Sequence, residues 1–89
     1  MKIYVVTSLI ENEEGGAEVN VIGVRKTKQD AYMLMTETLS IAKETYEEVG
    51  MEYNIEEYED NTMIIKTIDE DGEEDGLESI EYNIFEEEL

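Results

Sequence analysis

Residues 27–50, TKQDAYMLMTETLSIAKETYEEVG, decide the fold because they carry a complete helix together with both of its ends. Thr27 stands three residues before Asp30, which is the spacing of an N-cap hydroxyl with an acid in the first turn. Gly50 is a typical residue to end a helix. Apolar and small residues recur between these ends at gaps of three and four, which defines one helical face. The residues of this face are Ala31, Leu34, Met35, Thr38, Ile41, Ala42, Thr45, Tyr46 and Val49. The pattern predicts a helix of six turns over residues 28–49, about 33 Å long.

Two strands are expected before this helix. Residues 3–9 carry apolar side chains at both odd and even positions, which is typical of a strand that is apolar on both faces. Gly15 and Gly16 lie in a polar turn, and residues 17–25 follow with Val19, Val21, Ile22 and Val24. The two strands are close enough in sequence to pair as a hairpin.

Three more strands are expected after Gly50. Met51, Tyr53 and Ile55 alternate with polar residues, which predicts a strand with one apolar and one acidic face. Residues 59–61 form a turn, residues 62–68 a strand that is apolar on both faces, and residues 69–76 a loop with two Asp-Gly pairs typical of hairpins. The last strand spans residues 77–85, with Ile80, Tyr82 and Ile84 on one face. The acidic residues from Glu86 to Glu88 are expected to fray as a tail.

The predicted order is ββ-α-βββ, a single α+β domain over residues 1–89 with one antiparallel sheet of about five strands and one long helix. One helix covers one face of a sheet, so apolar side chains on the other face stay in water. At about 25 cal/mol per Å² of apolar surface, that exposure costs several kcal/mol. The sequence therefore predicts a homodimer formed through the uncovered face.

Composition excludes several classes of function. The chain has 89 residues with 25 acids and six bases, a net charge of −19, and no His or Cys. Zinc sites, disulfides, thiol nucleophiles and His-based catalysis are therefore excluded. The acidity argues against direct binding to nucleic acid or to an anionic membrane. No apolar run is long enough to span a membrane and no secretory signal is present, so a cytoplasmic protein is expected.

The charge is divided unevenly along the chain. Residues 1–43 hold six acids and five bases, a net charge of −1, whereas residues 44–89 hold the other 19 acids and one base, Lys66, a net charge of −18. One interpretation is a solvated, self-repelling surface, and the other is a surface with a binding role. Both remain open.

The acidic stretch from Glu44 to Asp60 is the main candidate site. Its candidate binding residues are Glu44, Glu47, Glu48, Glu52, Tyr53, Glu56, Glu57, Tyr58, Glu59 and Asp60. Glu52 and Glu56 share one face of a strand, where every second residue advances by about 6.6 Å. Nucleic acid also carries closely spaced negative charge. The sequence thus favours a non-enzymatic module that mimics nucleic-acid charge and occludes a basic, nucleic-acid-binding host protein.

The alternative is that Tyr46 and Tyr53 belong to the core and that the acids only keep the chain soluble. The protein would then be a small homo-oligomeric structural or regulatory protein. Its association would strengthen with salt, whereas binding to a basic partner would weaken.

Four other candidates are weaker. Residues 71–82 resemble a calcium loop, but Tyr82 stands where a bidentate Glu is required and the flanks are predicted strands, so a charged turn is preferred. Arg25, Lys26 and Lys28 either bind an anion near the helix N-terminus or attract the acidic half of the chain, and the second interpretation is preferred. Met33 and Met35 are expected to fill gaps in the core or an interface. Carboxylate pairs such as Glu56 and Glu57 arise by chance among 25 acids, so no enzyme, metal or cofactor is expected.

One resemblance concerns the start of the chain. Residues 2–7 (KIYVVT), 21–24 (VIGV) and 27–31 (TKQDA) resemble the hairpin-helix start of small uncharacterised phage and prophage proteins. The resemblance covers about residues 2–31 and implies a mobile-element origin without a defined activity. Because phage inhibitors of host defence nucleases are often small and acidic, it favours charge mimicry by analogy.

Overall fold

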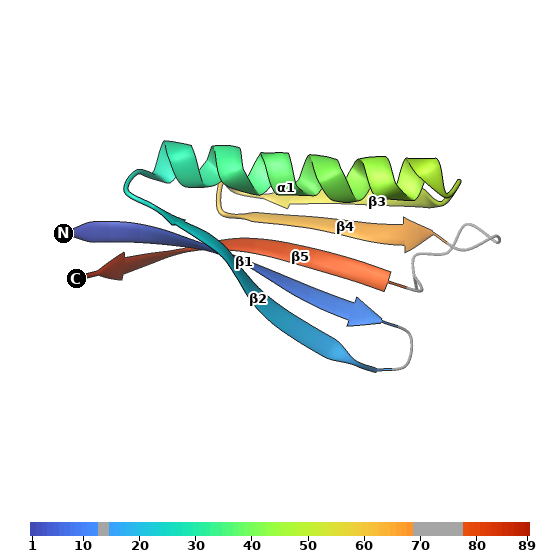
Figure 1. Ribbon diagram of the computed structural model, residues 1–89, viewed down its shortest axis with the longest axis horizontal. Helices are drawn as coiled ribbons and strands as arrows, with labels where there is room; N and C mark the ends of the chain where they lie inside the picture. Colours follow the sequence, from blue (N-terminus) through green and yellow to red (C-terminus); the bar gives the residue numbers. More distant parts are fainter. Residues whose placement is uncertain (13–14, 69–77) are drawn as a thin grey trace.

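The computed structural model describes residues 1–12, 15–68 and 78–89 as one antiparallel sheet covered by one helix (Figure 1). The elements in chain order are β1 (Lys2–Asn12), β2 (Ala17–Arg25), α1 (Lys28–Glu48), β3 (Glu52–Tyr58), β4 (Thr62–Ile68) and β5 (Glu78–Glu88). The predicted α+β fold and its order are confirmed. Across the sheet the strands lie in the order β2-β1-β5-β4-β3, so β2 and β3 are the two edges. The loop between β4 and β5, with the predicted Asp-Gly hairpin, lies outside the described residues.

Both predicted helix ends are confirmed. Thr27 has extended dihedrals, and its hydroxyl oxygen accepts a hydrogen bond from the Asp30 N–H at 3.1 Å. Gly50 takes a positive φ of 75°, and its N–H donates to the Glu47 carbonyl while the Met51 N–H donates to the Tyr46 carbonyl. This pair of bonds is a Schellman motif, which satisfies carbonyl groups at the end of the helix.

The predicted buried face of α1 needs a correction. Ala31, Met35 and Tyr46 are buried as expected, but Leu39 is buried too. Ile41 and Val49, which the pattern placed on the same helical face, are 65% and 66% exposed. Ile41 lies about 200° around the helix from Leu39, so the two side chains cannot point to the same sheet. Gaps of three and four residues define more than one stripe on this helix, and the sheet selects only one.

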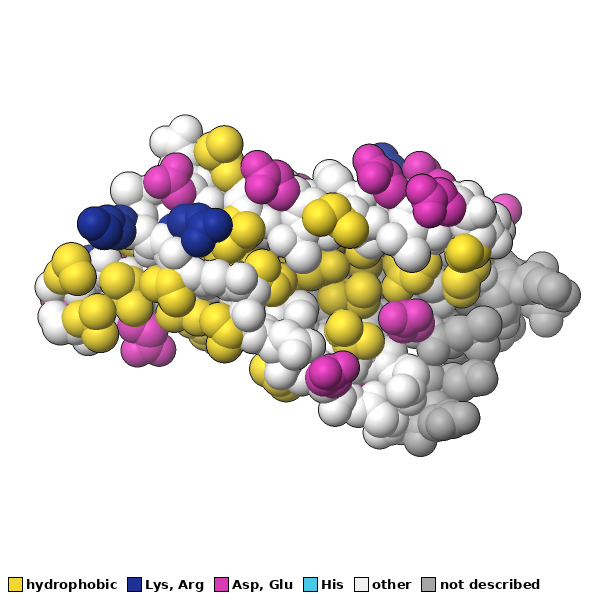
Figure 2. Space-filling view, viewed as in Figure 1, with side chains coloured by type: hydrophobic (Ala, Val, Ile, Leu, Met, Phe, Trp, Pro, Cys, Tyr) yellow, Lys and Arg dark blue, Asp and Glu magenta, His cyan; other side chains and the backbone are white. Residues whose placement is uncertain are grey.

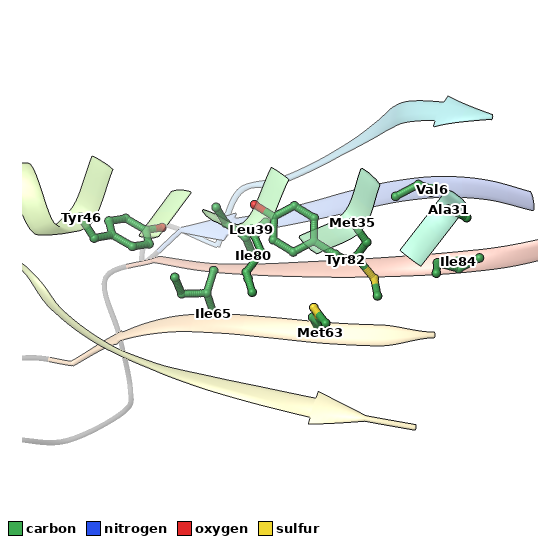
Figure 3. Packing of buried hydrophobic residues seen from close by; sticks show 10 residues of the cluster. All are labelled: Val6, Ala31, Met35, Leu39, Tyr46, Met63, Ile65, Ile80, Tyr82 and Ile84. Carbon is green, nitrogen blue, oxygen red and sulfur yellow. The ribbon is translucent and has the colours of Figure 1, made fainter. Parts of the chain in front are cut away.

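The core lies between α1 and one face of the sheet. Met35 of α1, Val6 of β1 and Ile65 of β4 are fully buried, and Met63 of β4 lies beside them. The predicted face of β5, with Ile80, Tyr82 and Ile84, is buried. Figure 3 shows the buried side chains spread along the length of the helix, with Tyr46 at one end and Ala31 and Ile84 at the other. Among the residues that the structure describes, no helix covers the opposite face of the sheet.

The last strand is longer than predicted. β5 continues to Glu88, and its final residues pair with β1 from Lys2↔Glu88 to Tyr4↔Glu86. The acidic end is therefore part of the sheet in this structure and not a frayed tail. The Lys2 ammonium lies 3.6 Å from the Glu86 carboxylate. Ladder hydrogen bonds to β1, which begins far away in sequence, hold these acids in place.

Candidate functional site

The acidic stretch from Glu44 to Asp60 folds back on itself at Gly50. Its first part is the end of α1, and its second part is the edge strand β3 with the turn after it. β3 pairs only with β4 among the described strands, and α1 packs beside both. We call the acids of this stretch the acidic edge. Its members are Glu44, Glu47, Glu48, Glu52, Glu56, Glu57, Glu59 and Asp60.

At the helix end of the acidic edge, Glu47 is bound to β3. The Tyr53 hydroxyl donates to the Glu47 carboxylate at 2.6 Å, which raises the pKa of Tyr53 to about 12. The Tyr53 ring packs against the core, with its centroid 6.3 Å from that of the buried Tyr46. Tyr53 therefore fixes the position of Glu47 and leaves little ring surface to a partner.

Along β3 the side chains alternate between the two faces of the sheet. Glu52 and Glu56 share the uncovered face, as predicted, because they oppose Ile68 and Ile64 of β4. The Glu56 carboxylate accepts a hydrogen bond from the Tyr58 hydroxyl at 2.7 Å and lies 3.6 Å from the Lys66 ammonium. The Tyr58 hydrogen bond, helped by Lys66, lowers the pKa of Glu56. The ring of Tyr58 is exposed and can contact a partner.

At the far end of β3 the acids face the start of α1. The Glu57 carboxylate accepts a hydrogen bond from the Tyr32 hydroxyl at 2.8 Å, and the Asp60 carboxylate pairs with the Lys28 ammonium at 2.9 Å. The Lys28 bond lowers the pKa of Asp60. Lys28 of the basic cluster thus contacts the acidic half of the chain, which is the preferred prediction for that residue.

Four acids of the acidic edge have charges that remain available to a binding partner. Glu44, Glu48, Glu52 and Glu59 are exposed, and none of them makes an ion pair or side-chain hydrogen bond with another part of the chain that the structure describes. The other four acids each have one of the partners given above. The structure therefore separates the candidate residues into fixed acids and available acids.

The density of charge along this edge can be compared with that of nucleic acid. β3 advances about 20 Å from Glu52 to Tyr58, and a turn with Glu59 and Asp60 follows it. The end of α1 lies beside this strand, so the eight acids correspond to about one charge per 2.5 Å, between the 3.4 Å spacing along one strand of DNA and the 1.7 Å spacing of a duplex. The edge is thus at least as dense in negative charge as a single strand.

Sequence reasoning missed an extension of this surface along α1. Asp30 and Glu37 are exposed and precede Glu44 by two intervals of seven residues, so the three acids share one side of the helix. Figure 2 shows acidic side chains along the outer ridge of α1. Met33 and Ile41 are exposed among them. The spacing of seven was the available signal, but Asp30 and Glu37 belong to the part of the sequence that is nearly neutral overall.

Metal and membrane sites find no support in the described residues. Within residues 1–12, 15–68 and 78–89, no group of three or more acids could hold a metal ion. Most of the calcium-loop candidate, residues 71–77, lies outside these ranges. The described helix α1 is not apolar enough to cross a membrane.

No protein-family model, curated protein or solved structure matches the chain. The resemblance of residues 2–31 to phage and prophage proteins stays a prediction.

Proposed function

We propose that this protein is a non-enzymatic binding module whose acidic edge occupies the basic, nucleic-acid-binding groove of another protein. The observation that supports this most is the density of charge on the acidic edge, eight acids on and beside a strand about 20 Å long with few bases beside them. A groove lined with Lys and Arg that accepts one nucleic-acid strand accepts negative charge of similar density. The exposed ring of Tyr58 adds contact area near the middle of this edge.

The rigidity of the acidic edge favours this role. Two hydrogen bonds, Tyr53 to Glu47 and Tyr32 to Glu57, join β3 to α1 at its two ends. The ion pair between Lys28 and Asp60 adds a third connection. Carboxylates held in place before binding lose less conformational entropy on association than those on a disordered acidic tail.

The predicted mobile-element origin indicates which class of protein the partner belongs to. For a phage or prophage protein, the basic partner is a host nuclease or defence effector inside the host cell, and occlusion of its groove inhibits it. Electrostatic attraction between the acidic edge and such a groove speeds association and makes binding weaken with salt.

Displacement of DNA tests the proposal directly. The heparin-retained protein fraction of the host cell is loaded with fluorescent single-stranded DNA and titrated with the protein at low ionic strength. We expect the protein to displace the DNA. A variant with Glu48→Lys, Glu52→Lys and Glu59→Lys should lose at least about tenfold in potency, because it reverses three available acids of the edge.

A matched variant separates the edge from net charge. Glu11, Glu18 and Glu87 are exposed acids outside the acidic edge, and their reversal to Lys also changes the net charge from −19 to −13. We expect this variant to keep its potency. Absence of displacement by the native protein, or equal losses in the two variants, would contradict the proposal.

The second candidate function is a homo-oligomeric structural or regulatory protein. It is favoured by the exposed valines Val19, Val21 and Val24 on the hairpin. The two candidates differ in the sign of their salt dependence, because salt screens attraction to a basic partner but also screens repulsion between copies of this acidic chain.

A further inference from the structure

The uncovered face of the sheet changes in character from one edge to the other. Cross-strand pairing places Val19, Val21 and Val24 of β2 beside Leu9, Thr7 and Val5 of β1, and Val5 in turn beside Phe85 of β5. Val19 and Val21 are 68% and 66% exposed, and Val24 and Phe85 are about half exposed. We call these residues the apolar patch.

A row of polar groups bounds the apolar patch on β5. The Thr62 hydroxyl donates to the Asn83 side-chain oxygen at 2.9 Å, and the Asn83 amide donates to the Glu81 carboxylate at 3.0 Å. Beyond this row the same face carries Lys66 and Glu56. The uncovered face is therefore apolar on β2 and β1, whereas the other three strands carry charged groups on it: Glu81 and Glu87 on β5, Lys66 between Ile64 and Ile68 on β4, and Glu52 and Glu56 on β3.

Net charge follows the same division. β1 and β2 together carry two bases, Lys2 and Arg25, and two acids, Glu11 and Glu18, so they are neutral. β3 holds three acids and β5 holds five, against one base in β4. β1 and β2, which carry all of the apolar patch except Phe85, thus form the part of the sheet where another strongly acidic molecule meets the least repulsion.

We propose that the apolar patch binds the apolar patch of a second copy of this chain, so that the protein is a symmetric dimer with two sheets packed face to face. The two-fold axis runs parallel to the strands and passes over β1, which places β2 of one copy above β5 of the other. Val24 then faces Phe85, and Glu81 and Glu87 of β5 lie at the rim of the contact, where their carboxylates stay in water. Burial of the exposed valines supplies the driving force. This inference does not depend on the proposed function.

Only this direction of the axis keeps the acidic edges apart. Strands in a sheet are about 4.8 Å apart, so the two copies of β3 lie on opposite sides of the dimer, separated by about 29 Å. This exceeds three Debye lengths at physiological salt. An axis perpendicular to the strands would place β3 above β3 and bring Glu52 and Glu56 of both copies together.

The size of the patch sets the expected affinity. Three strands of nine residues present about 14 by 30 Å of sheet, so two copies cover somewhat less than about 1,000 Å² in total. This is the low end of specific interfaces, and we expect a dimer that forms at micromolar concentration. An anionic membrane is a poorer occupant because it repels a chain of charge −19.

The mass of the protein in solution tests the inference. Sedimentation velocity is recorded from about 5 to about 200 µM protein, at about 0.15 M and about 1 M NaCl. We expect a monomer–dimer equilibrium that shifts toward dimer with salt. Val21→Lys should raise the dissociation constant at least about tenfold, because it places an ammonium group in the interface. It also makes the chain less negative, so repulsion between copies cannot account for the loss.

Ile41→Lys is the matched control, because Ile41 of α1 is 65% exposed and Val21 is 66% exposed. This variant should dimerise like the native protein. The triple variant Val19→Thr, Val21→Thr and Val24→Thr keeps β-branched side chains and the strand, and it should weaken the dimer as well. The inference is overturned if the native chain stays monomeric at the highest concentration and salt. It is also overturned if Ile41→Lys weakens the dimer as much as Val21→Lys does.

Discussion

The two edge strands of the sheet, β2 and β3, differ in how strongly their charges oppose pairing with another copy of the chain. β3 presents Glu52, Glu56 and Glu57 within seven residues, and a second copy of this edge is repelled. β2 has one acid and one base in nine residues, and its valines are exposed.

The difference shows that a chain with a charge of −19 can carry a neutral, apolar region on one side of its sheet. Repulsion between like charges opposes self-association over most of the surface and is weakest on β1 and β2. In the proposed dimer, the acids of β3 would therefore contribute to the specificity of the contacts of β2. The contrast between the strands can be tested by substitutions in each part of the sheet.

The largest expected effect on stability comes from a buried residue of β4, and an exposed residue of β2 serves as its comparison. Ile65→Ala removes a fully buried side chain of β4 and should lower the free energy of unfolding by about 2–5 kcal/mol. Val21→Ala should change it by less than about 0.5 kcal/mol in the monomer, because that side chain is already in water. Urea denaturation at low protein concentration measures both, and similar losses would show that the hairpin is packed as tightly as β4.

An intermediate effect concerns the place where β2 meets the helix. A Cβ at Gly23 would lie 2.8 Å from the Leu34 Cδ2 atom. Gly23→Val should therefore cost about 1–3 kcal/mol by overpacking, whereas Asn20→Val on the exposed part of the same strand should cost little. Thermal denaturation of the two variants gives the comparison. Equal melting temperatures would mean that the Leu34 side chain or β2 moves away without cost.

The smallest effect is a loss of stability at alkaline pH that begins on the β3 side. Burial raises the pKa of Tyr46 to about 12, and the bond to Glu47 raises that of Tyr53 to about 12, against 10.0 for ordinary tyrosine. The folded state thus holds these protons more tightly than the unfolded state. Their contribution is complete below pH 10 and is lost as the pH rises toward 12.

Tyr46→Phe should make the melting temperature less sensitive to pH between 10 and 12. The Tyr46 hydroxyl is buried and has no hydrogen-bond partner among the described residues, so its removal should leave stability at pH 7 equal or higher. Absorbance at 295 nm reports tyrosinate formation in the same samples. A pH dependence identical to that of the native chain would contradict this assignment.

Local signals predicted much of the fold. Thr27 and Gly50 determine the ends of α1 through bonds to residues only three or four positions away, and the alternation in β3 fixes which side Glu52 and Glu56 occupy. Long-range contacts set the rest. Leu39 is buried in place of Ile41 because the sheet selects one helical stripe, and Glu88 is ordered because β1 lies beside it.

The sequence predicted which residues belong to the candidate site, but it did not predict how they are arranged in space. The stretch from Glu44 to Asp60 is continuous in sequence, but Gly50 reverses the chain and the strand alternates its side chains. Tyr32 and Lys28, which bind two of these acids, come from the start of the helix. No periodicity within the stretch could have indicated them.

The closeness of the two ends of the described chain has a consequence for topology. The Leu89 N–H donates to the Met1 carbonyl at 2.7 Å, and the Met1 ammonium donates to the Leu89 carbonyl at 3.0 Å. The path of the backbone is therefore almost a closed ring. A short linker between residues 89 and 1, with new ends opened at Gly15 and Gly16, gives a circular permutant in which every strand keeps its neighbours. The same fold could thus form from a chain that starts at a different residue.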